Sequence, residues 1–442
     1  MNSKDPQIQS LRQREAYRSQ PDYVTFIPEY TSEGIPESGN EHFLVFESAK
    51  GALMAVWTSR NEPMPNIPPG EGPNNHILFS KSLDGGVTWE TPKHLAGPRP
   101  HEYHSHIANW AFPMVSQTGR IYVLWNQSRG IGGSIYMHTG GMAGRYSDDE
   151  GITWSEIQDI PFPNGPLDDP QGKIPPEWIV WQIPTRDLKD RFYVGFSHWV
   201  NKTAGYKHPP GRLGWTWLES VVEFMRFENI DNDPEPKDIQ VVFRSYGDEA
   251  LRVPHWRDPL VSVAQEPSLV RLPDQRLFCT MRTNTGYIWY SLSEDDGEHW
   301  CMPRPLLDKD FGRPLLQPVG CCPIYDISAG RYLLLYHNNR GNITPLPEEP
   351  EETACPRNPA YFALGEFRPK AHQPIWFSKP KVFINIRTEG VDGKPNPTQS
   401  IACYTSFTNV QGNRVLWYPD RKYFLLGKRV RDEFLADMQV PD

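Results

Sequence analysis

Residues that could perform acid–base or binding chemistry recur at one place in this chain, beside its apolar runs. Histidine is prominent among them: His42 opens one run, and His104 and His106 precede another. Histidine titrates near neutrality, so each ring could donate or accept a proton. Other polar or aromatic side chains lie at the start or end of further runs: Asn40, Asn109, Trp178, Trp181, Gln182, Glu266, Arg282, Gln317, His337 and Tyr404. If these side chains converge, the pocket suits a sugar that carries a carboxylate; alternatively, some only form hydrogen bonds inside the protein.

The elements that would position these residues form an internal repeat. Six times an apolar run meets a short turn, and a second apolar run follows and ends in polar residues. The copies cover residues 42–60, 110–126, 178–198, 266–284, 322–339 and 404–426. A spacing of about 70 residues is expected of four-stranded blades with long loops. The sequence predicts an all-β chain forming a single β-propeller of four-stranded antiparallel blades. Six blades are expected, or seven if the gap between the third and fourth copies holds another.

A second, shorter pattern supports this reading. It occurs as Ser82-x-Asp84-x-Gly86-x-Thr88-Trp89, Ser147-x-Asp149-x-Gly151-x-Thr153-Trp154 and Ser293-x-Asp295-x-Gly297-x-x-Trp300. Ser and Asp can bond to their own turn backbone, Gly allows a positive φ, and Trp can pack against a sheet. We interpret these residues as turn staples without a chemical role. The pattern resembles the Asp-box, or BNR repeat, of the sialidase (neuraminidase) superfamily, where it precedes the outermost strand of a propeller blade.

The resemblance to sialidases extends to single residues. In that family a Glu opens the inner strand of the fourth blade and an Arg follows sixteen positions later, as Glu266 and Arg282 do here. A second family Arg resembles Arg357, and the family's nucleophilic Tyr resembles Tyr404 in the Ala402–Ser406 segment. The resemblance implies that Glu266 takes the phenol proton of Tyr404, which is a poor nucleophile unaided. It also implies that the two arginines bind a carboxylate.

Two departures from the family pattern concern the first blade. Sialidases open this blade with Arg-Ile-Pro, but here residues 40–44 read Asn-Glu-His-Phe-Leu. The family's acid/base Asp follows that blade's second strand, whereas residues 61–81 contain only Glu62 and Glu71 as acidic residues. The chain thus resembles a divergent member without the third carboxylate-binding Arg. We therefore do not expect it to cleave ordinary sialosides.

Histidine occupies the altered region, and it leaves a second reaction open. His42, His104 or His106 could act as a base, and the His-x-His pair would also suit a metal. These features loosely resemble propeller polysaccharide lyases and hydrolases that act beside a uronate, such as rhamnosyl-glucuronate. The catalytic candidates are therefore Tyr404, Glu266, His42, His104 and His106. The substrate-binding candidates are Arg282, Arg357, Asn40, Trp178, Gln182 and His337. No metal ligand is assigned and no cofactor is required, although the channel could hold a structural divalent cation.

Composition narrows the partner classes. The chain has 442 residues and a net charge of −9 without long runs of like charge, which argues against nucleic acid as a partner. No stretch of 18 apolar residues occurs, so we expect no membrane span.

Residues 1–21 read as a polar extension without a signal peptide, and residues 22–442 as the propeller domain. We expect a cytoplasmic protein, or a secreted one whose signal was removed. The expected partner is a glycan substrate and the expected state a monomer or weak oligomer; a non-catalytic glycan-binding propeller remains the third alternative. The six cysteines leave disulfides open.

Overall fold

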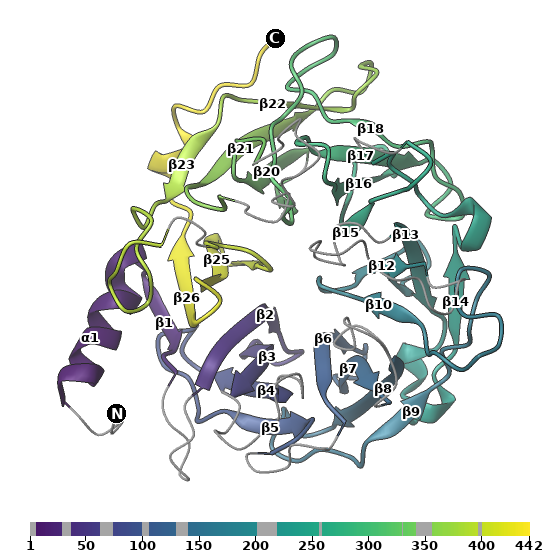
Figure 1. Cartoon of the computed structure of the whole chain (residues 1–442), viewed down its shortest axis with the longest axis vertical. Coiled ribbons are helices and arrows are strands. Elements are labelled where there is room, and N and C mark those ends of the chain that lie inside the picture. The colour runs from purple at the N-terminus through teal and green to yellow at the C-terminus, as the bar shows by residue number, and fades with distance from the viewer. Residues whose placement is uncertain are drawn as a thin grey trace.

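Six antiparallel sheets surround a common axis in the computed structural model (Figure 1). The structure describes residues 6–28, 37–61, 74–99, 106–129, 140–200, 219–255, 259–328, 330–341, 356–396 and 400–442. Each sheet has four strands, and two of the sheets add a fifth short one. The prediction of a six-bladed, nearly all-β propeller is therefore confirmed. The described residues between the third and fourth repeat copies hold outer strands of the third blade, and they form no seventh sheet.

The strands follow the chain from blade to blade. Blade 1 contains β2 (Glu37–Glu47), β3 (Leu53–Asn61), β4 (Asn74–Ser82) and β5 (Lys93–Ala96). Blade 2 contains β6 (Ala108–Val115), β7 (Ile121–Ser128), β8 (Gly140–Ser147) and β9 (Gln158–Ile160). Blade 3 contains β10 (Glu177–Ile179), β11 (Thr185–Arg186), β12 (Phe192–Trp199), β13 (Ser220–Phe227) and β14 (Val241–Arg244). In each of these blades the first strand lies nearest the axis (Figure 1).

The second half of the ring repeats this order. Blade 4 contains β15 (Gln265–Arg271), β16 (Leu277–Arg282), β17 (Trp289–Ser293) and β18 (Arg304–Pro305). Blade 5 contains β19 (Ile324–Ser328), β20 (Arg331–Tyr336), β21 (Ala360–Phe367), β22 (Ile375–Phe377) and β23 (Lys381–Ile384). Blade 6 contains β24 (Ser406–Val410), β25 (Asn413–Asp420), β26 (Phe424–Arg429) and, from the other end of the chain, β1 (Tyr23–Phe26).

Blade 6 closes the ring because it joins both ends of the chain. Strand β1 pairs antiparallel with β26, with Tyr23 opposite Gly427. Helix α1 (Pro6–Ala16) and the short helix η1 (Tyr17–Ser19) precede β1, and the Ser19 hydroxyl lies 2.8 Å from Tyr418 Oη. The remaining helices of the described residues are short: η2 (Ile230–Asn232), η3 (Pro236–Asp238), η4 (Gly247–Glu249) and α3 (Asp432–Leu435). Closure pairs the edge strand of the last blade, which would otherwise expose its backbone groups.

The three Ser-x-Asp-x-Gly turns are tied by their own side chains. Ser82 Oγ accepts the Gly86 N–H at 2.8 Å and donates to Asp84 Oδ1 at 2.8 Å. Asp84 also accepts the Thr88 N–H at 2.9 Å and the Thr88 hydroxyl at 2.6 Å. These hydrogen bonds, those from Thr88 first, lower the pKa of Asp84 to about 2. The turns of Asp149 and Asp295 are built in the same way, with His299 in place of Thr in the last one.

The glycine of each of these turns is where neighbouring blades meet. All three have a positive φ, which glycine adopts without strain. A Cβ would also collide with an aromatic ring of the preceding blade: at Gly86 2.4 Å from Trp417, at Gly151 2.4 Å from Phe79, and at Gly297 2.5 Å from Tyr193. The turn pattern therefore shapes one blade and seats it against the next.

Candidate functional site

Four residues near the ring axis share an uncommon backbone conformation. His42, Trp110, Glu266 and Tyr404 have φ values of 62°, 56°, 49° and 63°. The first three of these residues each belong to a one-residue β-bulge, in β2, β6 and β15 respectively. Strand pairing resumes two positions after each of them, at Leu44, Phe112 and Ser268. Tyr404 likewise stands two residues before Ser406, the first paired residue of β24. Left-handed backbone is unfavourable for these residue types, and such strain is common at functional sites.

The bulges are held by the preceding blade. In three cases the N–H of the left-handed residue donates to a side chain there: Trp110 to Thr58 Oγ1 at 3.0 Å, Glu266 to Ser197 Oγ at 2.7 Å, and Tyr404 to Cys321 Sγ at 3.1 Å. A buried N–H that has lost its strand partner is costly unless it is satisfied in this way. Blade-to-blade packing thus fixes the side chains that face the axis.

Tyr404, Glu266 and Arg282 form a hydrogen-bonded cluster. The phenol oxygen of Tyr404 lies 2.9 Å from Glu266 Oε1, and Arg282 Nη1 donates to the same carboxylate oxygen. Arg282 Nη1 also lies 3.4 Å from Tyr404 Oη. Strand pairing places the arginine, since Arg282 in β16 stands opposite Gln265 in β15. The three side chains are at most 5% exposed, so their interactions act in a medium of low polarity.

The electrostatics of this cluster favour a proton on the phenol. Burial and the negative charge of Glu266 raise the pKa of Tyr404 well above its ordinary value, against the opposing charges of Arg282 and Arg357. The neutral phenol therefore donates to Glu266 Oε1, while Glu266 Oε2 has no hydrogen-bond partner in the described part of the chain. A carboxylate in this position can accept the phenol proton, and Arg282 is placed to stabilise the phenolate that results.

Aromatic rings form the wall beside Tyr404. The Trp110 ring meets the Tyr404 ring edge-on at 5.0 Å, and the Trp181 ring lies 6.1 Å from it. His42 lies one ring further away, 5.0 Å from Trp110. Burial lowers the pKa of His42 to about 3, so its imidazole is neutral near pH 7. Trp110 was not among the residues proposed from the sequence, although its place two residues before Phe112 matches that of His42 before Leu44.

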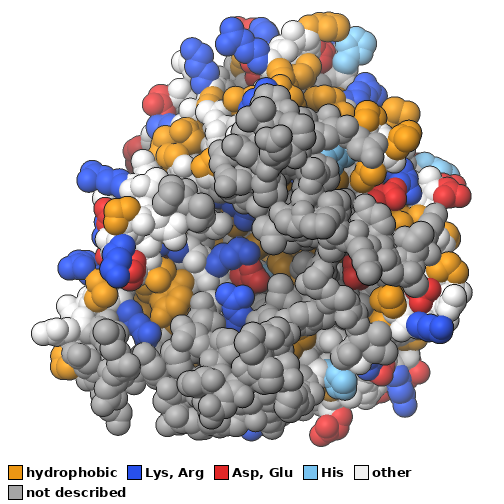
Figure 2. All heavy atoms as spheres, in the orientation of Figure 1, with side chains coloured by type: hydrophobic (Ala, Val, Ile, Leu, Met, Phe, Trp, Pro, Cys, Tyr) orange, Lys and Arg blue, Asp and Glu red, His pale blue; other side chains and the backbone are white. Residues whose placement is uncertain are grey.

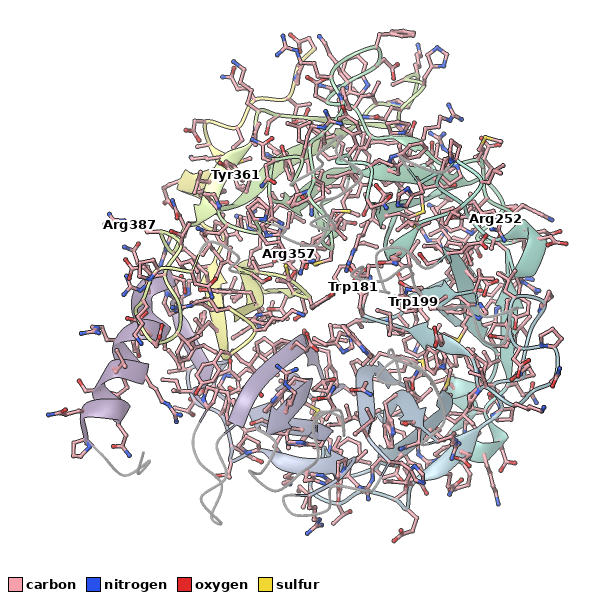
Figure 3. The ribbon with its side chains drawn as sticks, viewed as in Figure 1. Trp181, Trp199, Arg252, Arg357, Tyr361 and Arg387 are labelled. Carbon is pink, nitrogen blue, oxygen red and sulfur yellow. The ribbon has the colours of Figure 1, made fainter. Side chains whose placement is uncertain are left out.

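Arg357 and His337 line the same region from blade 5. Arg357 Nε donates to the Val319 carbonyl at 2.9 Å and Nη2 donates to it as well. His337 Nε2 lies 2.9 Å from the Ile401 carbonyl oxygen, and burial lowers the pKa of this histidine. Figure 3 shows Arg357 and Trp181 close to the ring centre, and Figure 2 shows basic and acidic side chains gathered there.

Several residues proposed from the sequence lie elsewhere. Trp178 is completely buried, stacks on Phe162 and donates its indole N–H to the Gly140 carbonyl at 2.9 Å, so its ring is part of the core between blades. Gln182 lines a cavity of about 340 Å³ farther along the inner strands. His106 is exposed, and His104, like Glu62 and Glu71, lies outside the described residues.

Asn40 is buried and engaged in local hydrogen bonds. Its Nδ2 donates to the Tyr423 carbonyl at 2.9 Å, and its Oδ1 accepts the Trp57 indole N–H at 3.0 Å. The amide thus joins blade 1 to the turn that follows β25 in blade 6. Asn40 nevertheless borders a small polar cavity of about 140 Å³ beside the cluster.

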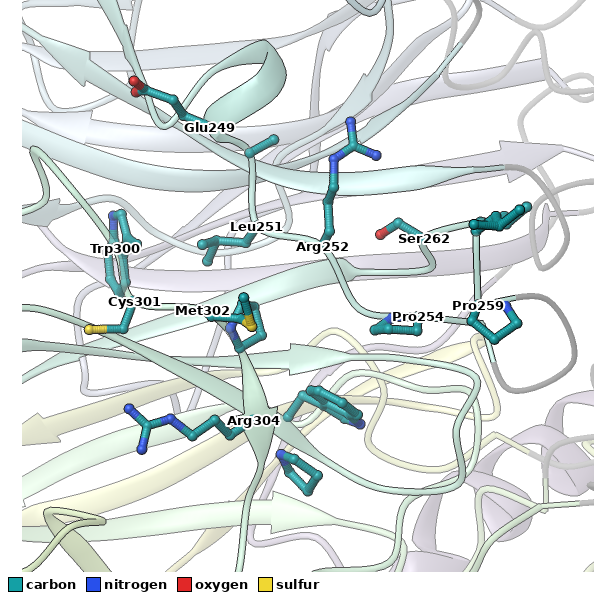
Figure 4. Close-up of a pocket in the computed structure, with 16 residues that line it drawn as sticks. Glu249, Leu251, Arg252, Pro254, Pro259, Ser262, Trp300, Cys301, Met302 and Arg304 are labelled. Carbon is teal, nitrogen blue, oxygen red and sulfur yellow. The ribbon is translucent and has the colours of Figure 1, made fainter.

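A further cavity is mainly apolar and lies away from the candidate catalytic residues. At the outer edge between blades 3 and 4, a cavity of about 650 Å³ is lined by side chains such as Leu251, Pro254, Trp300 and Met302 (Figure 4). None of the residues proposed for catalysis or binding lines it. Within the described ranges, no group of three or more His, Cys, Asp or Glu side chains is arranged to hold a metal ion. Neither is any helix in those ranges long and apolar enough to cross a membrane.

Comparison with known proteins adds evidence on the fold. No protein-family model and no curated protein matches the sequence. Among solved structures, a protein of unknown function from Dyadobacter fermentans aligns with a TM-score of 0.56 and 11% identity, over 92% of this chain and 96% of that one. NanB sialidase from Streptococcus pneumoniae aligns with a TM-score of 0.58 and 12% identity, over 93% and 70%. The intramolecular trans-sialidase of Ruminococcus gnavus aligns with a TM-score of 0.54 and 13% identity, over 92% and 96%. The chain therefore has a sialidase-like propeller fold.

Proposed function

We propose that this protein cleaves a terminal glycosidic bond in an anionic, carboxylate-bearing glycan, as a sialidase-like exo-glycosidase with Tyr404 as its nucleophile. The observation that carries the proposal is the contact of Tyr404 with Glu266 and Arg282 at the ring axis. Tyrosine nucleophiles are a known exception among glycosidases, and a base beside the phenol is what such a nucleophile needs. The likeness in fold to sialidases and trans-sialidases is consistent with it.

The reaction follows from the positions of these groups. Glu266 takes the phenol proton as the Tyr404 oxygen bonds to the anomeric carbon, and the bond from that carbon to the leaving oxygen breaks. The leaving oxygen takes up a proton from water. A water molecule then attacks the anomeric carbon and gives its proton to the hydroxide left by the first step, while the bond to the Tyr404 oxygen breaks. Glu266 returns its proton to that oxygen, which restores the phenol as the sugar is released. Arg282 stabilises negative charge on the phenol oxygen in both steps, because its Nη1 already lies within 3.4 Å of that oxygen.

The charges around the cluster suit an anionic substrate. Arg282 and Arg357 both act on Tyr404 electrostatically, and guanidinium groups bind carboxylates well. Their burial holds them in place before the substrate arrives, so little reorganisation is required on binding.

A second reaction, β-elimination next to a uronate, would use His42 as its base. Elimination requires a base for the C5 proton, neutralisation of the carboxylate and a proton for the leaving oxygen. His42 is neutral at pH 7, but the burial that lowers its pKa to about 3 also makes it a weak base, so this reaction requires that bound substrate change its surroundings. Tyr404 and the two arginines would serve as proton donor and carboxylate partners. A polysaccharide lyase of rhamnosyl-glucuronate type is therefore the alternative enzyme, and a non-catalytic glycan-binding propeller is the alternative without catalysis.

A substrate panel with two tyrosine variants tests the proposal. Sialosides and uronic-acid glycans are incubated with the wild type, with Tyr404→Phe and with Tyr336→Phe. Tyr336 is a matched control, because it is fully buried and its hydroxyl has no hydrogen-bond partner among the described residues. We expect Tyr404→Phe to lose roughly a hundredfold or more in turnover and Tyr336→Phe to keep it.

The products and the His42→Gln variant separate the alternatives. Hydrolysis releases a saturated sugar, whereas elimination gives an unsaturated uronate that absorbs ultraviolet light. An unsaturated product together with an inactive His42→Gln variant would establish elimination. Binding without turnover of any glycan would leave the non-catalytic alternative, and full activity of Tyr404→Phe would overturn the assignment of the nucleophile.

A further inference from the structure

A small polar cavity lies beside Tyr404 on the blade 1 side. Its volume is about 140 Å³, and it is lined by Gly39, Asn40, Glu41, Thr58, Arg60, Asn75 and Lys422. The ammonium of Lys422 lies 5.0 Å from the centre of the Tyr404 ring. Lys422 therefore lines the cavity and also lies next to the candidate nucleophile.

Lys422 is held in this position by a constrained turn. The turn between β25 and β26 places Arg421 and Lys422 at φ values of 58° and 50°. Arg421 anchors the turn, since its Nε donates to Asp420 at 2.7 Å and its Nη1 to Glu15 at 3.1 Å. The Lys422 carbonyl accepts the Asn40 N–H at 2.8 Å, which ties the turn to blade 1. Two successive non-glycine residues in left-handed backbone persist only where the surroundings fix them.

The cavity wall also contains charged side chains of both signs. Lys422 pairs with Glu41 at 2.6 Å, and Arg60 brings a second cation to the wall. A Cβ on Gly39 would come within 3.3 Å of Arg60 Nη2, so the glycine leaves room for the guanidinium. Lys422 retains donor capacity beside Glu41, because an ammonium offers three N–H groups.

Lys422 is more accessible than the two arginines of the cluster. Its side chain is 38% exposed, whereas that of Arg282 is 2% exposed and already donates to Glu266. Arg357 is also buried and donates twice to the Val319 carbonyl. An anion that enters from solvent beside Tyr404 therefore reaches the Lys422 ammonium without displacing a buried ion pair.

We propose that this cavity is a substrate subsite for the anionic, hydroxylated part of a sugar, with Lys422 as the residue that pairs with its carboxylate. Glu41 is a positioning residue that holds the ammonium toward the cavity in the absence of substrate. Arg60, Asn75 and Thr58 supply polar groups for the sugar hydroxyls. The inference rests on the proposed function, because it names the group through which that function would recognise its substrate.

Binding of free acid sugars tests the role of Lys422. N-Acetylneuraminic acid, glucuronic acid and the methyl ester of each are titrated calorimetrically into the wild type, Lys422→Met, Lys422→Arg and Lys50→Met. Lys50 is the control, because it is an exposed lysine in the β2–β3 turn of blade 1, away from the cavity lining. We expect Lys422→Met to weaken binding of an acid roughly tenfold or more without weakening the neutral ester. Lys422→Arg should keep most of the acid affinity, and Lys50→Met all of it.

The outcomes separate this inference from the proposed function. Unchanged acid affinity in Lys422→Met overturns the subsite, even if Tyr404→Phe abolishes cleavage. A selective loss of acid affinity supports the subsite, even if the wild type cleaves no glycan and the proposed reaction fails. If the wild type binds neither acid, both proposals fall. A loss of affinity for acid and ester alike, with a lowered Tm, would assign Lys422 a structural role and overturn the inference.

Discussion

The axis and the outer turns of this propeller both depend on left-handed backbone, but they use different residues for it. Each turn of Asp84, Asp149 and Asp295 has two successive left-handed residues, of which the second is always glycine, which adopts a positive φ readily, and the first is Gly85, Glu150 or Asp296. At the axis a positive φ falls on His42, Trp110, Glu266 and Tyr404, for which it is unfavourable by about 1–3 kcal/mol each. The turns thus reserve glycine for the position that packs against the next blade, whereas at the axis the left-handed position carries large side chains that could do chemistry. The comparison indicates which unusual backbone positions serve folding and which serve a site.

The largest expected effect at the axis is loss of turnover in Glu266→Gln. The amide cannot take the phenol proton, yet it has nearly the same shape as the carboxylate. We expect turnover by the folded protein to fall roughly a hundredfold or more, and the Tm to fall as well, because the buried Arg282 loses its charged partner. Glu235→Gln is the control, since Glu235 pairs with Tyr146 and Gln158 on the outer side of blade 2. If Glu266→Gln turned over substrate as well as Glu235→Gln does, the axis would not be the reaction centre.

Substitutions in the turns should lower stability and leave turnover unchanged. In one turn, Gly85 and Gly86 have φ values of 72° and 92°, but only Gly86 contacts a ring. A Cβ at Gly86 would lie 2.4 Å from Trp417, whereas at Gly85 it meets no atom within 4 Å. Gly85→Ala therefore measures the backbone strain alone, and Gly86→Ala adds the collision with the neighbouring blade.

We expect Gly86→Ala to be less stable than Gly85→Ala by about 1–3 kcal/mol, measured by denaturant unfolding. Turnover by the folded fraction should stay at the wild-type level in both variants. Equal stability of the two variants would show that Trp417 adjusts without loss and that the glycine serves only the turn.

Blade 3 contains a buried charged cluster away from the axis, which allows a test of whether burial and charge alone identify a catalytic site. His198 lies 2.8 Å from Asp168 and 2.7 Å from Glu223, and all three side chains are at most 1% exposed. Burial acts to lower the pKa of His198, but the hydrogen bonds and charges of the two carboxylates raise it to about 10. The imidazolium is thus fully bonded, and the backbone at these three residues shows no positive φ.

We expect the His198 cluster to affect stability and not turnover. A pKa raised from about 6.5 in the unfolded chain contributes stability that is complete below pH 6.5 and is lost as pH rises toward 10. The wild-type Tm should therefore fall across this range more steeply than that of His198→Gln. His299→Gln, at an exposed turn, serves as the control. Parallel Tm curves for the wild type and His198→Gln would contradict the assignment.

The fold could be predicted from the sequence because its structural unit repeats along the chain. Apolar pairs of runs and three similar turns recur along the chain, and each copy reports the same local structure. The sequence also proposed Glu266, Arg282 and Tyr404 together, and the structure brings them into contact. Their catalytic roles remain predictions.

Other parts of the site depend on three-dimensional closure and could not be predicted. Lys422 belongs to blade 6 but faces blade 1, a neighbour only because the ring closes. Trp110 lies beside Tyr404 because of a β-bulge in β6, and the residue types of this segment do not predict a bulge. Trp178 is a tryptophan at the start of a run as well, yet it packs in the core, since sequence alone does not distinguish a ring that faces the axis from one between blades.

The smallest expected effect concerns the carboxylate of an outer turn. Asp149 accepts the Thr153 N–H and the Ser147 hydroxyl, each at 2.8 Å. Although burial acts to raise it, these bonds and that of the Thr153 hydroxyl lower the pKa of Asp149 to about 2. The stability they contribute is therefore present above about pH 4, the ordinary value of Asp, and is lost as pH falls toward 2.

Asp149→Asn should accordingly lower the Tm by only about one to three degrees at pH 7, because the group is partly exposed and screened by solvent. The Tm difference should be smaller at pH 3, where part of the contribution of the carboxylate is already lost. Asp148→Asn is the matched neighbour, since its surface pair with Arg120 lies outside the turn's own hydrogen bonds. Turnover should be unchanged in both variants. A selective loss of turnover in Asp149→Asn with an unaltered Tm would mean that the turn takes part in the site, and the division between an axis that serves the site and turns that serve the fold would then be wrong.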